Sequence, residues 1–217
     1  MRTIIGIDYS LRSPAVSVLT KDNQIHHFLF PRIGVHKKLF IENLKLADVI
    51  VTEIPDIKVP KDLILREQLN SQDAENLALI VCQTINPYCQ GELQFAIEGM
   101  SFNAPGNSKL QVSAYVSILR YLISKHFTVP YDTMFTYSPM TIKSINLCSK
   151  RGIGKAGVIE AFISSENSLN QVSKFWQTLR QNPEMFQNKN GNWLKIDDII
   201  DSFHTIICHL EKSKELS

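Results

Sequence analysis

Four acidic residues have the types and the spacing to bind metal ions. Asp8 ends the apolar run TIIGID, and Glu98 ends the apolar run LQFAIE. A carboxylate in such a position is costly unless a cation or a hydrogen-bond donor balances its charge. Asp198 and Asp201 lie three residues apart, so on a helix they point to the same side.

If these four carboxylates converge, they repel one another strongly, and a bound cation removes that repulsion. Ligand sets made only of oxygen suit Mg²⁺, with Mn²⁺ as a substitute. Two such ions about 4 Å apart can activate a water and stabilise the leaving oxygen in phosphodiester hydrolysis. A simpler interpretation also exists, in which Asp8 and Glu98 cap turns where their strands end.

The acidic stretch at residues 197–201 leaves the ligand set open. An aspartate at a helix start is commonly an N-cap, so we assign the cap to Asp197 and the metal role to Asp198. Asp197 and Asp201 would nevertheless also share one side of the helix. We expect His204 to lie at the surface or behind the ligands rather than to bind the ion, because hard cations prefer oxygen.

The net charge of +2 indicates no partner by itself, but the charges are unevenly distributed. Residues 101–157 contain seven basic residues and one acid, whereas residues 196–217 contain five acids and two lysines. An acidic cluster beside a basic segment suits an enzyme that holds divalent cations and binds a polyanion. On charge alone, a solvated charged surface is the simpler explanation.

The composition is that of an ordinary globular protein, with 44% hydrophobic and 20% charged residues. A chain of 217 residues can bury one full core, whereas two complete domains would be cramped. Its apolar stretches are too short to span a bilayer, and the N-terminus has no signal-peptide pattern. We therefore expect a cytoplasmic protein with no membrane partner, whose four cysteines stay reduced.

The order of the expected elements predicts an α/β fold. Apolar runs at residues 3–8, 15–20 and 25–30 are spaced as an antiparallel meander with the first strand central. Strands then alternate with helices, which predicts a mixed five-stranded sheet with helices on both faces. The other expected strands are 93–98 and 133–137, with a candidate short strand at 49–52, and the expected helices are 73–85, 108–126, 138–145, 156–163, 172–179 and 197–211.

Four motifs, in order along the chain, resemble those of RuvC-type Holliday-junction resolvases of the ribonuclease H-like superfamily. Residues 5–11 (IGIDYSL) look like the first-strand motif G-I-D-P-G-L, and residues 97–103 (IEGMSFN) resemble the E-G-x-x-F form of phage-type RuvC-like nucleases. Residues 137–155 are similar to the family's P-x-x-x-K followed by a G-x-G…K loop. Residues 198–203 (DIIDSF) are similar to the D-x-A-D-A-L helix.

This resemblance implies a single RuvC-like nuclease domain over residues 1–217, with helical insertions near residues 37–88 and 165–195. It implies catalytic metal ligands at Asp8, Glu98, Asp198 and Asp201, with Mg²⁺ as the cofactor. It also implies a homodimer that makes two symmetric nicks in branched DNA. Lys143 and Lys155 would contact phosphates, and Lys150 and Arg151 belong to the same basic segment.

Phe102 has two interpretations. It lies in a polar turn just past the second acid, where an aromatic side chain is either a lid over the core or a wedge that stacks on a base. The resemblance favours the wedge, because relatives carry a stacking aromatic near this place. The chain departs from the family at Tyr9-Ser10, which replaces the usual Pro-Gly, and at Ile199-Ile200, which replaces smaller residues.

Two other functions remain open from the sequence. One is a ribonuclease H-type enzyme that cuts the RNA strand of a hybrid with the same metals. The other is a non-catalytic nucleic-acid-binding protein that kept the fold. The D-x-x-D spacing and the basic loop favour the resolvase type, and the retention of all four acids disfavours an inactive relative. A sugar-kinase or actin-like ATPase would need a second glycine-rich phosphate loop and a longer chain.

Overall fold

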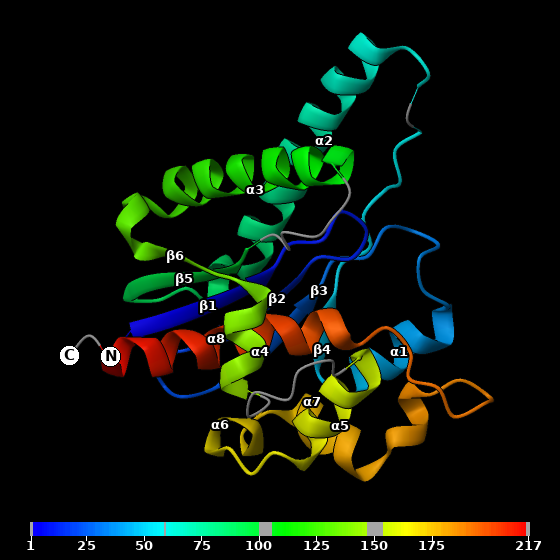
Figure 1. Cartoon of the computed structure of the whole chain (residues 1–217), viewed down its shortest axis with the longest axis vertical. Helices are drawn as coiled ribbons and strands as arrows, with labels where there is room; N and C mark the ends of the chain where they lie inside the picture. Colours follow the sequence, from blue (N-terminus) through cyan, green and yellow to red (C-terminus); the bar gives the residue numbers. More distant parts are fainter. Residues whose placement is uncertain (1, 59, 100–105, 147–153, 216–217) are drawn as a thin grey trace.

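A six-stranded mixed sheet lies at the centre of the molecule (Figure 1). The computed structural model describes residues 2–58, 60–99, 106–146 and 154–215. The strand order is β4-β3-β2-β1-β5-β6; β1–β2 and β2–β3 pair antiparallel, and the other pairs are parallel. The strands are β1 (Arg2–Asp8), β2 (Ala15–Leu19), β3 (Ile25–Leu29), β4 (Val49–Val51), β5 (Glu92–Glu98) and β6 (Met134–Tyr137).

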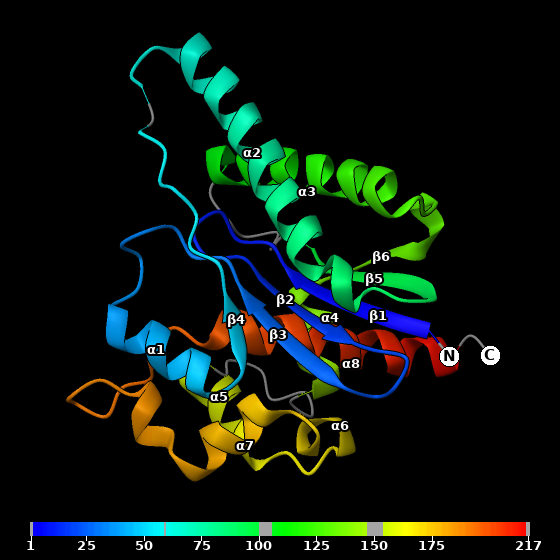
Figure 2. The same cartoon turned by 180° about the vertical axis from the view of Figure 1, so that it is seen from behind.

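Helices cover both faces of this sheet (Figures 1 and 2). Helices α2 (Leu63–Ile85) and α3 (Gly106–Phe127) pack on one face. The opposite face carries α8 (Asp197–Glu215) together with α1 (Lys38–Leu46), α4 (Pro139–Asn146), α5 (Lys155–Ser164), α6 (Ser168–Gln171) and α7 (Lys174–Gln181). Three short 3₁₀ turns complete the described elements: η1 (Asn86–Tyr88), η2 (Tyr131–Thr133) and η3 (Pro183–Phe186). Among the described residues, no helix combines the length and the apolar character needed to cross a membrane.

The predicted mixed sheet with helices on both faces is confirmed, but it has six strands rather than five. The additional strand is β4, the candidate short strand, which pairs in parallel with β3 over three residues. Helix α2 also begins at Leu63, about three turns of helix before the predicted start at residue 73. Its start is fixed by Asp62, whose side chain accepts a hydrogen bond from the Leu65 amide at 2.9 Å.

Alternate residues of β1 enter two separate cores. Ile5 and Ile7 pack under α2 and α3, whereas Ile4 packs in the layer that contains α8. Because successive side chains of a strand point to opposite faces, Gly6 and Asp8 share the α8 face with Ile4. One face of β1 therefore packs in the core under α2 and α3, and its other face points the Asp8 carboxylate toward α8.

Helix α8 approaches β1 closely because position 6 is glycine. A Cβ added to Gly6 would overlap the Ser202 carbonyl oxygen and lie 2.7 Å from Ile206 Cγ1. The absence of a side chain lets the helix backbone come down onto the strand. This approach sets the distance between the first strand and the acids at the start of α8.

A chain of buried polar groups fixes α8 against the sheet. Ser202 Oγ lies 2.8 Å from Ser17 Oγ of β2, which lies 2.9 Å from His27 Nδ1 of β3. His27 Nε2 lies 2.8 Å from Ser173 Oγ, the N-cap of α7. Burial lowers the pKa of His27 to about 3, so its imidazole is neutral at physiological pH. A neutral ring donates from one nitrogen and accepts at the other, which lets it join the two serines.

Replacing Gly6 with alanine should destabilise the fold, because the added Cβ would force α8 away from β1. We expect the free energy of unfolding, measured by urea denaturation, to fall by about 3 kcal/mol, the upper end of the usual cost of overpacking. Gly154→Ala is the matched control, since nothing lies within 4 Å of a Cβ at that N-cap position. The control should lose less than about 1 kcal/mol. Equal losses in the two variants would contradict the tight contact.

Candidate metal centre

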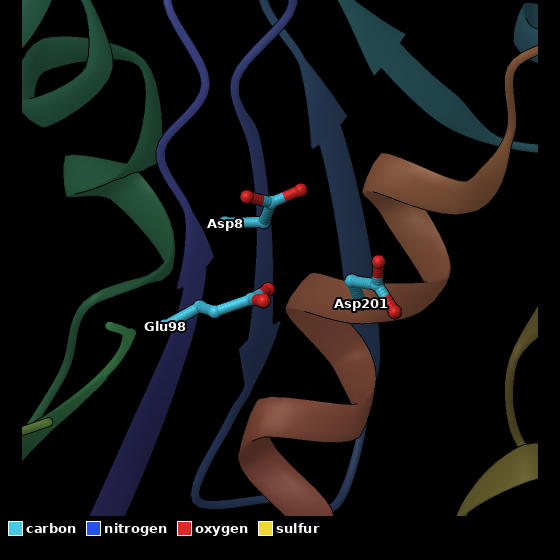
Figure 3. A group of neighbouring side chains, drawn as sticks. All are labelled: Asp8, Glu98 and Asp201. Carbon is cyan, nitrogen blue, oxygen red and sulfur yellow. The ribbon is translucent and has the colours of Figure 1, made fainter. Parts of the chain in front are cut away.

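Three carboxylates meet between β1, β5 and α8 (Figure 3). Asp8, Glu98 and Asp201 each offer one oxygen, and these atoms all lie within 4.8 Å of one another. Among the described residues, no other group of three or more acids, histidines or cysteines lies close enough together to share an ion. The structure thus brings together three of the four predicted ligands.

Strand pairing explains why Asp8 and Glu98 meet. β1 and β5 run parallel, and Ile7 pairs with Ile97, so the two acids end neighbouring strands at the same edge. Ile97 packs in the core under α2 and α3, so Glu98 points to the opposite face, toward α8. Asp201 completes the group from the second turn of α8.

Burial and mutual repulsion disfavour the ionised form of all three acids. The pKa of Glu98 is raised to about 8, first by burial and then by the Asp201 carboxylate, while Lys143 opposes the shift. Burial also raises the pKa of Asp201 to about 6 against the influence of Lys143. The pKa of Asp8 is raised well above its usual range, first by burial and then by Glu98. Three acids whose ionisation is disfavoured, gathered in one partly buried place, form an oxygen-only donor set that fits a divalent cation.

The other two aspartates of α8 are held by lysines. Asp198 lies next to the group, but its Oδ2 atom is 3.1 Å from Lys195 Nζ. This oxygen is buried, and the Lys195 ammonium group is the cation that lies beside it. Asp197 is the first residue of α8 rather than the residue before it, and its carboxylate pairs with Lys155. The predicted cap role of Asp197 is therefore replaced by an ion pair.

His204 is neither at the surface nor beside the acids. Its side chain is buried, and its ring packs edge-on against Phe162 at 5.7 Å between centroids. Burial lowers the pKa of His204 to about 3, so the residue behaves as a neutral member of the core. The expectation that it does not join the acids holds, whereas a surface position was wrong because this side of α8 faces α5.

A cleft of about 550 Å³ gives access to the acidic group. Asp8 and Glu98 line it, together with the loop that follows β1 and with Lys143 and Lys195. The Lys143 side chain is exposed and close enough to Glu98 and Asp201 to influence both carboxyl groups. A negatively charged phosphate entering the cleft would therefore meet cations beside the acids.

The remaining predicted nucleic-acid contacts are only partly described. Lys155 is exposed, although its ammonium group pairs with Asp197. Phe102, Lys150 and Arg151 lie outside the described residues. Lys195, which the sequence analysis missed, lies three residues before Asp198 but outside α8, so helical spacing did not indicate the ion pair.

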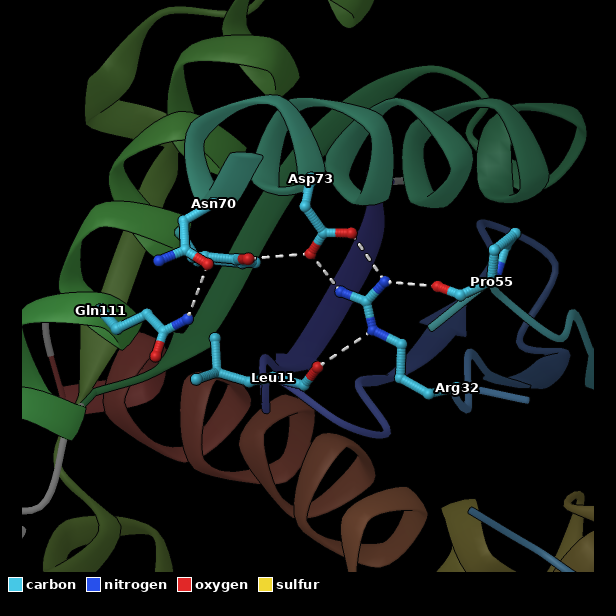
Figure 4. A network of polar contacts seen from close by, with 7 residues as sticks. Leu11, Arg32, Pro55, Asn70, Asp73 and Gln111 are labelled. Atoms are coloured by element: carbon cyan, nitrogen blue, oxygen red, sulfur yellow. Dashed lines mark hydrogen bonds and ion pairs between the residues drawn. The ribbon is translucent and has the colours of Figure 1, made fainter. Parts of the chain in front are cut away.

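A buried ion pair supports the loop that follows Asp8 (Figure 4). Arg32 pairs with Asp73 of α2 and also donates to the Leu11 carbonyl at 3.4 Å and to the Pro55 carbonyl at 2.9 Å. The Tyr115 hydroxyl of α3 donates to Asp73 at 2.8 Å. Removing one partner of such a pair leaves a buried charge unbalanced. The pair thereby ties one wall of the cleft to the helices on the far face.

Among the solved structures that match the fold, two do so over nearly its whole length. Both are of RuvC from Thermus thermophilus, with TM-scores of 0.51 and 0.52 and sequence identities of 11% and 10%. The matches cover 97% and 98% of this chain and 96% of each RuvC chain. The second structure is described as RuvC in complex with a Holliday junction substrate. No family profile matches the sequence, and no curated protein matches it either. The chain has a RuvC-like fold of the ribonuclease H-like α/β type.

Proposed function

We propose that this chain is a metal-dependent endonuclease that cuts branched DNA. The observation that carries the proposal is the group of three partly buried carboxylates, from two adjacent strands and one helix, at an open cleft bordered by lysines. The RuvC-like fold supports it, since one of the matching structures is RuvC with a Holliday junction substrate. Four-way junctions are therefore the first substrate to test.

Asp8, Glu98 and Asp201 are the residues that would hold Mg²⁺ or Mn²⁺. When bound, such ions supply an activated water and stabilise the leaving oxygen in phosphodiester hydrolysis. Asp198 is the fourth ligand of the proposal, and exchange of its Lys195 partner for a cation would free its buried oxygen to serve. The close-packed contact of α8 with β1 keeps the ligand carboxylates in place before a cation arrives.

The lysines position the phosphate. Lys143 lies at the cleft beside two of the acids, where its ammonium group can hold a phosphate oxygen without displacing them. Lys155, Lys150 and Arg151 extend this basic surface in the proposal, and Phe102 stacks on an unpaired base of the junction. Two symmetric nicks in one junction require two active sites, so the proposal includes a homodimer.

Asp8→Asn and Asp201→Asn should each abolish cleavage while the protein stays folded. Each change removes one charge from a mutually repelling group, so stability should be unchanged or higher. The measurement is nick mapping on labelled four-way, flap, linear duplex and RNA–DNA substrates in Mg²⁺, with melting temperature as the check of folding. Asp48→Asn is a control, since that exposed aspartate lies outside the acidic group. Wild-type cleavage in either active-site variant would sink the assignment, and cleavage of the hybrid alone would favour a ribonuclease H activity.

Metal-free protein should lose stability as the pH rises from about 5 to about 8. Glu98 has a folded-state pKa of about 8 and an ordinary value of 4.5, so the folded chain keeps a proton that the unfolded chain releases. The stability that the Glu98 proton gives to the folded chain is therefore complete below the ordinary pKa of a glutamate. This stability is lost as the pH rises through the pKa that Glu98 has in the folded chain. The measurement is the melting temperature across this range in a chelator and in Mg²⁺.

Added Mg²⁺ should raise the melting temperature more at pH 8 than at pH 5, because cations and protons compete for the same carboxylates. Glu98→Gln should flatten the metal-free profile, since the substituted side chain has no proton to lose. A wild-type melting temperature that climbs steadily through this range without metal would contradict the described electrostatics.

A further inference from the structure

We propose that a second groove, beside the metal centre, binds the sugar–phosphate backbone of the nucleic-acid strand that leaves the site of cleavage. This lysine groove lies between the start of α1 and the segment 184–195, and it has a volume of about 720 Å³. Lys37, Lys189 and Lys195 line it, with Asn43, Asn188 and Asn190. The inference rests on the proposed function and names a contact surface of the same substrate.

The charge of the groove favours a polyanion. Three of the residues that line the groove are lysines, and one, Glu184, is an acid. Lys37 and Lys189 are exposed, and neither has an ion pair within the described part of the chain. The asparagine amides add neutral donors between these cations. Exposed ammonium groups interspersed with amides are the usual contacts to phosphate oxygens, which they hold independently of base sequence.

The groove adjoins the cleft that leads to the metal centre. Lys195 lines both the acidic cleft and the lysine groove, and it pairs with Asp198 between them. A second link runs through the loop after β1, where Ser10 Oγ accepts from the Ser13 amide at 3.1 Å. Ser13 Oγ in turn lies 3.2 Å from Nε2 of His36, which lines the groove. A strand that passes the acids therefore meets the groove next.

Hydrogen bonds hold both walls in place. On one wall, Asn188 Oδ1 accepts from the Asn190 amide at 2.9 Å and from the Asn192 amide at 3.1 Å. Gly191, with φ of 75°, completes this tight turn, which carries Lys189. Between the two walls, Asn43 of α1 donates to the Met185 carbonyl at 2.7 Å. The backbone that carries Lys189 is thus ordered before a ligand binds, which reduces the ordering cost of binding.

The experiment compares two double variants that remove equal charge. Lys37→Ala/Lys189→Ala changes the groove, and Lys45→Ala/Lys174→Ala removes two exposed lysines that line none of the described clefts. Both are made in the Asp8→Asn background, so that the probe stays uncut in Mg²⁺. The probe is a fluorescently labelled four-way DNA junction with long or short arms, and binding is followed by anisotropy over a range of salt.

The groove variant should bind the long-armed junction about tenfold more weakly, and its log–log salt slope should be shallower by about 2, for two lost phosphate contacts. The control variant should keep the parent's slope. Shortening the arms should weaken the parent more than the groove variant. Unchanged melting temperatures establish that both variants are folded.

Equal salt slopes in the groove and control variants would overturn the groove assignment. Cleavage of junctions by the wild-type chain, measured in parallel, tells whether the proposed function fails as well. A wild-type chain that cuts junctions while the slopes stay equal refutes the groove alone. A chain that binds neither junction nor duplex refutes both proposals.

Discussion

The contact between α8 and β1 at Gly6 is the constraint on which the acidic site depends. Asp201 comes from a helix near the end of the chain and Asp8 from the first strand, so their meeting requires the helix backbone to rest on the strand. The Ser202–Ser17 hydrogen bond locks the helix in the same turn. A side chain at position 6 would lift the helix and separate the carboxylates, even though no chemical group of the site had changed.

The site also carries an electrostatic cost that the fold only partly offsets. Burial and mutual repulsion raise the pKa values of Asp8, Glu98 and Asp201. Lysines balance the neighbouring charges at Asp197 and Asp198 but pair with none of these three acids among the described residues. Such a site is disfavoured in the empty protein and favoured when a cation binds, which is the behaviour expected of preorganised ligands.

Local patterns in the sequence predicted the main strands, the helix order and the three clustered acids. Alternation along β1 and the matching acid at the end of β5 were enough to place Asp8 and Glu98 together once the strands were paired. The spacing of Asp198 and Asp201 predicted a shared helix face, but it could not show that Lys195 holds the first of them. That distinction depends on the path of the segment before α8.

Other features depend on contacts that are distant in sequence. The strand β4 is three residues long, and it is a strand because it pairs with β3. The sequence placed His204 at the surface or behind the ligands, because the packing of α5 against α8 leaves no local pattern in the sequence. Arg32 and Asp73 are 41 residues apart, so nothing near either residue indicated that they pair. The lysine groove likewise joins α1 to a turn far along the chain.

The most direct test of the account is to locate Mn²⁺ in crystals of the wild-type protein by its anomalous scattering. The three carboxylates present the oxygen ligands that this ion prefers, and their mutual repulsion falls when it binds. The account predicts an anomalous peak between the Asp8, Glu98 and Asp201 carboxylates, and its loss in Asp201→Asn crystals grown in the same way. Peaks confined to other acids, with the three carboxylates unoccupied at saturating Mn²⁺, would contradict it.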